Sequence, residues 1–447
     1  MDPNLLVALA LGTLIALLIL RVPIAYALGG VASAGLFLYF SWRPGAAFDP
    51  ERGLTPALSL IGSTAFDFVH NYPLSMIPLF IGLGHIAYHA GITTDLYYAL
   101  RVWLARAPGG LAMASIVGCG GFSAVSGSSV ACAAAMGRIT VPEMLRYGYS
   151  PRLATAAVAA GGTLGSLIPP SLLFVIYAIF TEQSVKWLFL AGILPGLLSL
   201  AGYLVTTWVW VRLRPQDAPM PEETYTRQER LRVLSGLWPI GLLLGIIIGG
   251  IFLGIFTPTE AAGISLVTAI LIGLGRRRLK LSAMYTAFSE TARQTAAIFA
   301  IALGAKLFVS FASLTRIAPN LLDWVQGTGA SMVVIIIALV LLYILLGMFL
   351  DSIGILVLTL PFVIPIVDDF GLSLIWFGVV VIKLLEIGLI TPPVGLNAFV
   401  IKSVAPPDVR LEHIFKGIGW FLILDFVVLL LILLIPGISL WIPMASR

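Results

Sequence analysis

Long apolar runs alternate with short polar interruptions along the whole chain. The runs at residues 5–20 and 24–40 are separated only by Arg21-Val22-Pro23, and similar runs follow as far as the C-terminus. About 20 apolar residues in a helix span the hydrocarbon core of a membrane, which is roughly 30 Å thick. The pattern therefore predicts membrane-crossing helices, the first two of which form an antiparallel pair.

Two breaks rich in proline and glycine interrupt the most apolar parts of this pattern. They are Gly165–Ser171 and Gly388–Asn397, and each contains two consecutive prolines. Because proline lacks a backbone donor and ends a helix, a helix that begins near Ser373 should unwind at the second break and restart after it. Unsatisfied backbone groups cost several kcal/mol each in hydrocarbon, so broken helices persist where protein encloses them or where they line a binding cavity.

The breaks also mark an internal repeat with a constant offset of 223 positions (388 − 165 and 392 − 169). The same offset pairs Ser129 with Ser352, Pro142 with Pro365 and Gly148 with Gly371. An ungapped register through these residues predicts two copies of one unit, which is typical of a transporter whose site lies between repeats. The first repeat would occupy 1–211 and the second 233–447, with a polar linker at 212–232.

Each copy contains a second interrupted apolar segment. In the first copy, residues 110–141 are divided at Ser126–Ser129 into two arms of roughly 15 residues, or about 22 Å each, which is too short to cross. This predicts a re-entrant hairpin with its tip inside the membrane. The offset places its twin at about 330–366, with a tip at Phe349–Gly354. If the repeats are inverted, the hairpins enter from opposite faces and all four irregular segments converge near the midplane.

The composition excludes a soluble globular protein, because 59% of residues are hydrophobic and only 11% are charged. The predicted fold class is all-α, a polytopic membrane protein in a lipid bilayer. The net charge of +5 is carried mostly by loops, so it reports topology and does not indicate nucleic-acid binding. Basic residues gather in two loops, at about Arg212–Arg232 and at Arg276–Lys280. Two predicted helices, Val233–Phe256 and Glu260–Gly275, separate these loops, so both can be cytoplasmic. Thr259 is expected to cap the second of these helices.

The irregular segments offer distinct chemistry to ions. A helix that restarts after Pro170 or Pro393 exposes free amides that suit anions, whereas the carbonyls at the preceding helix ends suit cations. Hydroxyls and the carbonyls of Gly165 and Gly388 are oxygen ligands appropriate for Na⁺. Asp351 is the only carboxylate at either tip, and Ser128 takes its place in the other copy.

Alternatives remain for several of these residues. An intramembrane carboxylate points to function, but Asp351 could instead only cap the following helix. The tip serines could likewise be local caps. Asn397 could bond unwound backbone or line the site.

Other polar and small residues share helix faces. His85 and His89 lie one turn apart, but no glutamate occupies the position that a zinc hydrolase requires. Lys383 and Glu386 are three residues apart and are expected to pair, with a proton relay as the alternative. A glycine stripe would let another helix of this chain or of a partner approach closely; it comprises Gly241, Gly245 and Gly249.

Several motifs, in order along the chain, resemble the signature runs of the large membrane subunit of tripartite ATP-independent periplasmic (TRAP) transporters. They are Val125–Gly137, Gly162–Ser171, Gly254–Ala262, Gly347–Asp351 and Gly388–Asn397. The resemblance implies an elevator-type Na⁺-coupled secondary transporter in the bacterial inner membrane, with a scaffold and a mobile transport domain that carries both hairpins. It also implies a separate small four-helix membrane subunit and a periplasmic binding protein that delivers an organic acid. No other cofactor is expected.

The resemblance also implies site residues. By the resemblance, Ser126, Ser171 and Asp351 face the substrate, and the chemistry of the tip and the break adds Ser128 and Asn397 as substrate candidates. The Na⁺ candidates, largely through backbone, are Ser126, Gly127, Ser129, Gly165, Pro169, Ser352, Gly388, Thr391 and Pro392. The sequence departs from the family at Lys383–Glu386, where an asparagine and uncharged residues are more usual, and this bears on the coupling ion.

Other functions compete with this interpretation. The nearest is a stand-alone Na⁺/carboxylate symporter of related architecture. An intramembrane hydrolase would need a nucleophile beside a base, and Ser129 has no histidine in the core of its own repeat, so an enzyme is not expected.

Overall fold

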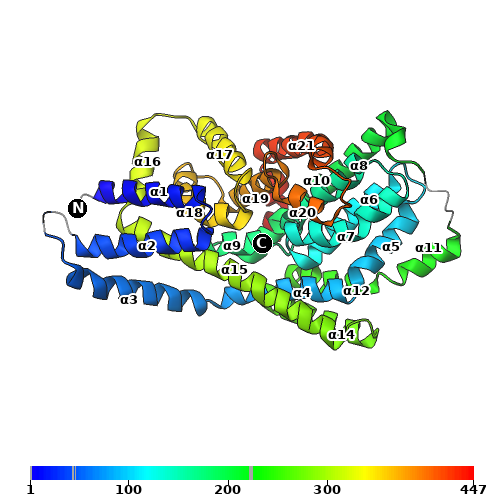
Figure 1. The fold of residues 1–447 in the computed structure, drawn as a ribbon, viewed down its shortest axis with the longest axis horizontal. Coiled ribbons are helices and arrows are strands. Elements are labelled where there is room, and N and C mark those ends of the chain that lie inside the picture. Colours follow the sequence, from blue (N-terminus) through cyan, green and yellow to red (C-terminus); the bar gives the residue numbers. More distant parts are fainter. Residues whose placement is uncertain (1–2, 43–44, 46, 221–224, 447) are drawn as a thin grey trace. The chain divides into compact units, whose positions relative to one another are not determined.

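The computed structural model describes residues 3–42, 45, 47–220 and 225–446, and every structural statement below refers to these. Helices are the only regular elements in this part of the chain, which confirms the all-α prediction (Figure 1). Seven helices are long and apolar enough to cross a membrane, or nine if two bent pairs each count as one span.

The chain divides into two compact units. The first comprises the described parts of 1–75 together with 293–338 and 353–374. In it, α2 (Ile24–Ser41) lies against both α1 (Pro3–Ile19) and α3 (Pro50–Val69), so the predicted pairing of the first two helices is confirmed. The unit also contains the short 3-10 helix η1 (Tyr72–Ser75), α16 (Ile317–Gly327), and residues of α15 (Leu281–Leu314), α17 (Met332–Gly347) and α18 (Ser352–Asp369).

The second unit comprises the described parts of 76–292 and 375–447 together with 339–352. Its first half holds α4 (Met76–His89), α5 (Ile92–Leu104), α6 (Gly110–Ser126), α7 (Ser129–Arg146), α8 (Pro151–Leu167), α9 (Leu172–Thr181) and α10 (Val185–Leu213). Its second half holds α14 (Pro258–Gly275), α19 (Leu374–Ile390), α20 (Leu396–Val404), α21 (Leu411–Leu434) and α22 (Gly437–Ala445). Helix α8 is central, because α6, α7, α10 and α21 all contact it and every residue from Leu153 to Leu167 is buried.

Helix bounds recur at the offset of 223 positions. Helices α7 and α18 cover 129–146 and 352–369, and α8 and α19 cover 151–167 and 374–390 (352 − 129 and 374 − 151). The fully buried stretch of α19, Trp376–Ile390, has the same offset from that of α8. Such agreement supports a duplicated unit. The inverted orientation and the boundaries of the repeats stay predictions.

The interruptions lie where proline and glycine predict them, with small differences in extent. Helix α7 continues to Arg146, past Pro142, so the second arm of the first hairpin ends five residues later than predicted (146 − 141). Helix α19 stays helical through Gly388 to Ile390, so its break begins at Thr391. The peptide bonds Pro169-Pro170 and Pro392-Pro393 are both cis.

The region around the predicted linker is more helical than expected. Residues 227–234 form α11 (Arg227–Leu234), which a capping box of Thr226 and Glu229 begins, whereas 221–224 lie outside the described residues. The single helix predicted over Val233–Phe256 is instead α12 (Trp238–Leu244), a π-helical turn η3 (Gly245–Gly249) and α13 (Gly250–Phe252).

The predicted cap of α14 is wrong. Thr257, not Thr259, is the N-cap: its hydroxyl accepts from the Glu260 amide at 3.3 Å, and the Glu260 carboxylate accepts from the Thr257 amide at 2.8 Å. Because Pro258 suits the first helical position, where no backbone donor is needed, the helix begins earlier than predicted.

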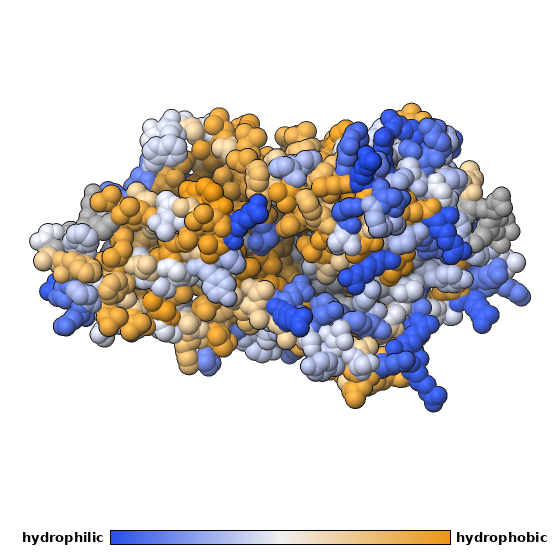
Figure 2. Space-filling view, viewed as in Figure 1, coloured by the Kyte–Doolittle hydropathy of each residue, from blue (hydrophilic) through white to orange (hydrophobic). Residues whose placement is uncertain are grey.

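The glycine stripe of α12 and η3 faces open space. Apart from neighbouring residues of the same helix, no described atom lies within 4 Å of a Cβ placed on Gly241, Gly245 or Gly249. No other helix of the described residues therefore packs closely against the stripe. Apolar side chains are exposed elsewhere as well, including Leu341 and Leu345 on α17, where Figure 2 shows a hydrophobic surface. Hydrophilic residues gather over α11 in the same view.

Candidate functional site

The tip of the first hairpin touches the first break. The Leu172 amide donates to the Gly127 carbonyl at 3.0 Å, and a Cβ on Gly127 would lie 2.7 Å from the Pro170 carbonyl oxygen. Gly127 has a φ of +64°, which glycine adopts without strain. A Cβ on Gly165 would lie 2.7 Å from the Ser129 amide nitrogen. The first tip and the first break are therefore in contact, with glycine on both sides, while the convergence of all four irregular segments stays a prediction.

The serines at this contact differ in what they bond. Ser128 caps α7 through the Ala131 amide (3.4 Å), and Ser171 caps α9 through the Phe174 amide (3.3 Å). The capping alternative therefore holds for the tip residue Ser128, Ser171 at the break is a cap as well, and the substrate roles of both stay predictions. The buried Ser126 hydroxyl has no hydrogen-bond partner among the described residues.

A buried hydroxyl pair lies at the same place. The Ser129 and Ser166 hydroxyl oxygens are 2.8 Å apart, and both side chains are buried. Pro169 lines an apolar pocket with Phe189 and Ile247. The only atom that a proline can offer to a cation is its backbone carbonyl oxygen. Oxygen ligands at this break thus come from hydroxyls and backbone.

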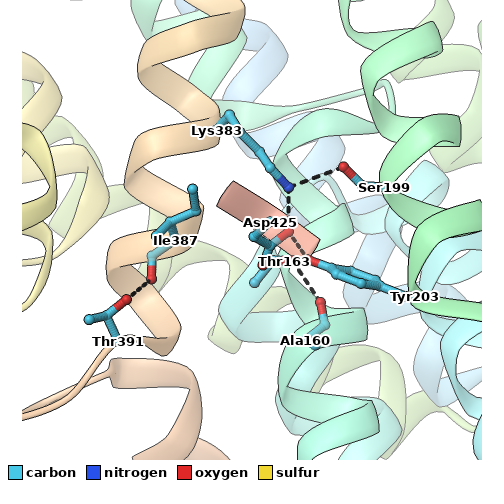
Figure 3. Close-up of polar contacts among 8 residues, drawn as sticks. All are labelled: Ala160, Thr163, Ser199, Tyr203, Lys383, Ile387, Thr391 and Asp425. Carbon is cyan, nitrogen blue, oxygen red and sulfur yellow. Dashed lines mark hydrogen bonds and ion pairs between the residues drawn. The ribbon is translucent and has the colours of Figure 1, made fainter. Parts of the chain in front are cut away.

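The second break shows a comparable close approach. A Cβ on Gly388 would lie 2.6 Å from the Gly347 Cα, so α19 and the end of α17 touch through glycine. The Thr391 hydroxyl donates to the Ile387 carbonyl at 2.6 Å (Figure 3), which leaves its oxygen lone pairs as possible ligands. Pro392 is exposed.

The remaining predicted residues occupy separate positions. Asp351 is half-buried and directly precedes α18, whose first residue, Ser352, is buried. Asn397 is fully buried and its amide donates to the Ala159 carbonyl at 3.4 Å. That carbonyl belongs to the interior of α8, so the backbone that Asn397 bonds is helical and not unwound.

A buried ion pair replaces the one predicted within α19. The Lys383 ammonium lies 2.5 Å from the Asp425 carboxylate of α21 and 3.1 Å from the Ser199 hydroxyl of α10 (Figure 3). The predicted Lys383–Glu386 pair is wrong, because the packing of α10 and α21 offers Lys383 a better-placed carboxylate.

The same cluster extends toward the first break. The Tyr203 hydroxyl donates to Asp425 at 2.7 Å and lies 2.8 Å from the Thr163 hydroxyl, two residues before Gly165 (Figure 3). Sequence reasoning missed Asp425 and Tyr203. Asp425 could have been identified from the sequence, because it is the only charged residue between Gly417 and Leu434 in a strongly apolar run.

The histidines of α4 form an ordinary polar cluster. His85 and His89 both contact the same Glu290 oxygen, at 3.1 and 3.3 Å. Among the described residues, no group of three or more His, Cys, Asp or Glu side chains is arranged to hold a metal ion. The structure therefore adds no support for a metal site here.

Comparisons with known proteins agree on one family. Residues 11–438 match the family model described as the tripartite ATP-independent periplasmic transporter, DctM component. The chain is 33% identical over 397 residues to the C4-dicarboxylate TRAP transporter large permease protein DctM of Pseudomonas aeruginosa, covering 89% of this chain and 91% of that protein. It is 30% identical to the sialic acid TRAP transporter large permease protein SiaM of Vibrio cholerae, covering 86% of this chain and 91% of the relative.

A solved structure shares the fold. The chain is similar to the YdaH transporter of Alcanivorax borkumensis with a TM-score of 0.60 and 16% identity, over 94% of this chain and 97% of the other. At this identity the likeness concerns the fold alone. The match to the family model over nearly the whole chain decides the assignment: the chain belongs to the DctM family of large inner-membrane permease subunits of TRAP transporters, which work with a small membrane subunit and a periplasmic binding protein.

Proposed function

We propose that this permease uses an inward Na⁺ gradient to import an organic acid that a periplasmic binding protein delivers. The observation that carries the proposal is the contact of the first hairpin tip with the first break, where Gly165 lies against Ser128 and Ser129. Buried hydroxyls and backbone carbonyls gather there, and hard cations prefer oxygen ligands of this kind.

The second break supports an equivalent cation site. Gly388 lies against Gly347, and the Thr391 hydroxyl oxygen keeps lone pairs beside the end of α19. The C-terminal end of a helix carries a partial negative charge from its free carbonyls, which favours a bound cation. We therefore place one Na⁺ near each break.

The proposed substrate class rests on the partial positive charge at two helix N-termini and on the substrates for which two relatives are named. Helices α7 and α9 begin at Ser129 and Leu172, beside the same contact, and their N-termini favour an anion. The two relatives are named for C4-dicarboxylate and sialic acid, which are both acids. We propose a carboxylate substrate. In this scheme both hairpins move with the transport domain as an elevator.

Uptake into liposomes that contain the permease with its small subunit tests the driving force. We expect transport of delivered substrate to require an inward Na⁺ gradient, to stop when an ionophore dissipates that gradient, and to be unaffected by ATP. Equal uptake in Na⁺-free buffer under a proton gradient would show that the ion assignment is wrong and would direct attention to Lys383 and Glu386.

A further inference from the structure

Glu386 is a fully buried carboxylate without a bonded partner. It lies on α19, within the stretch Trp376–Ile390 that is buried throughout, and its side chain is 1% exposed. Neither carboxylate oxygen has a hydrogen-bond partner among the described residues. Burial of an isolated carboxylate is costly, so either a proton or a bound cation must neutralise it.

The nearby lysine is already engaged. Lys383 lies one turn before Glu386 on α19, but its ammonium is 2.5 Å from Asp425 and 3.1 Å from Ser199. The cluster thus contains two carboxylates and one ammonium, and all three charged side chains are 1% exposed. Because Lys383 bonds Asp425 and Ser199, no cationic side chain of this cluster bonds Glu386.

The polar groups that face Glu386 come from the first hairpin and the first broken helix. The Ser129 and Ser166 hydroxyls are near enough to act electrostatically on its carboxyl group, although no hydrogen bond joins them to it, and they are 2.8 Å from each other. Beside Ser166, a Cβ on Gly165 would lie 2.9 Å from the Ser128 carbonyl oxygen, so a tip carbonyl is near as well. A carboxylate, two hydroxyls and a carbonyl together form a set of hard oxygen donors.

We propose that the Glu386 carboxylate, with the Ser129 and Ser166 hydroxyls, ligates one Na⁺ at the contact between the first tip and the first break. The inference rests on the proposed Na⁺ coupling and adds a charged ligand from the second half of the chain. The bound cation neutralises Glu386, and the carboxylate makes the site bind Na⁺ more tightly than neutral oxygens alone would.

Sodium-dependent thermal stabilisation of the purified permease–small-subunit complex tests the assignment. The unfolding midpoint is measured as NaCl replaces choline chloride at constant ionic strength, which yields an apparent Kd for Na⁺. We expect Glu386→Gln to raise this Kd by at least tenfold, about 1.4 kcal/mol, and Ser166→Ala to raise it less. The matched control is Glu412→Gln, which neutralises an exposed carboxylate that bonds Lys416 and should leave the Kd unchanged.

The outcomes separate this inference from the proposed function. If the parent complex responds to Na⁺ and Glu386→Gln responds equally, Glu386 is not a ligand while Na⁺ coupling stands. If the parent does not respond in stability or in uptake, both proposals fail. If Glu386→Gln keeps the Na⁺ Kd but removes a pH dependence of uptake, the group carries a proton and the assignment is overturned.

A second variant covers the case in which Glu386→Gln does not fold. Glu386→Asp keeps the charge on a shorter side chain, so the complex should assemble and bind Na⁺ more weakly than the parent. Ser129→Ala should show a weakened response too. A parent-like Kd in Ser129→Ala, Ser166→Ala and Glu386→Asp together would contradict the proposed ligand set.

Discussion

Lys383 and Asp425 form an ion pair with a nitrogen–oxygen distance of 2.5 Å, and both side chains are 1% exposed. The pair joins α19, which leads into the second break, to α21. Through Tyr203 and Thr163 the same polar cluster reaches α8, which leads into the first break. The helices that precede the two breaks are therefore connected by buried polar side chains.

Removal of Asp425 alone should destabilise the protein strongly. Asp425→Leu leaves the Lys383 ammonium buried without its counter-charge, and such a loss costs about 3–5 kcal/mol. We expect a lower unfolding midpoint and less assembled complex. The double variant Lys383→Met/Asp425→Leu removes both charges and should recover most of the lost stability. A double variant no more stable than Asp425→Leu would contradict this account.

Asp351→Asn tests the carboxylate at the second tip. The amide keeps the size and most of the capping ability of Asp351 but removes its charge. If Asp351 contributes to the transport site, initial uptake should fall at least tenfold, about 1.4 kcal/mol, at normal abundance of the complex. Ser128→Ala, at the paired position of the first tip, should cost less, because it removes one hydroxyl and no charge. Near-normal uptake by Asp351→Asn would leave Asp351 as a cap only.

Gly165→Ala tests the close approach of the first tip to the first break. The added methyl would lie 2.7 Å from the Ser129 amide nitrogen, so the tip must move away and the oxygen ligands must separate. We expect uptake to fall and the apparent Kd for Na⁺ to rise. Gly30→Ala is the matched control, because a Cβ there meets nothing within 4 Å. Similar uptake by the two variants would show that the contact is not needed.

Delivery of the substrate distinguishes a tripartite system from a stand-alone symporter. In liposomes that contain the permease and the small subunit, free substrate at high concentration should not be taken up until the binding protein is added. The readout is initial uptake with and without that protein under the same Na⁺ gradient. Uptake of free substrate at the delivered rate would favour the stand-alone alternative.

The helical class, the interrupted segments and the breaks could all be predicted from the amino-acid sequence, because these features depend on local properties. Apolar runs decide which segments are helices in a membrane, and Pro169 and Pro392 interrupt them wherever they are placed in space. A regular offset also predicted a duplicated unit, and the bounds of α7 and α18, like those of α8 and α19, lie 223 positions apart.

Tertiary structure decided which polar groups meet. Lys383 is closer in sequence to Glu386, yet it bonds Asp425, because the partner of a buried charge depends on which helices pack together. The same dependence left Glu386 beside Ser129 and Ser166, which the spacing along α19 does not reveal. Hydrophobic periodicity places a side chain on a helix face, whereas the neighbouring helix that this face contacts is settled only when the whole chain has folded.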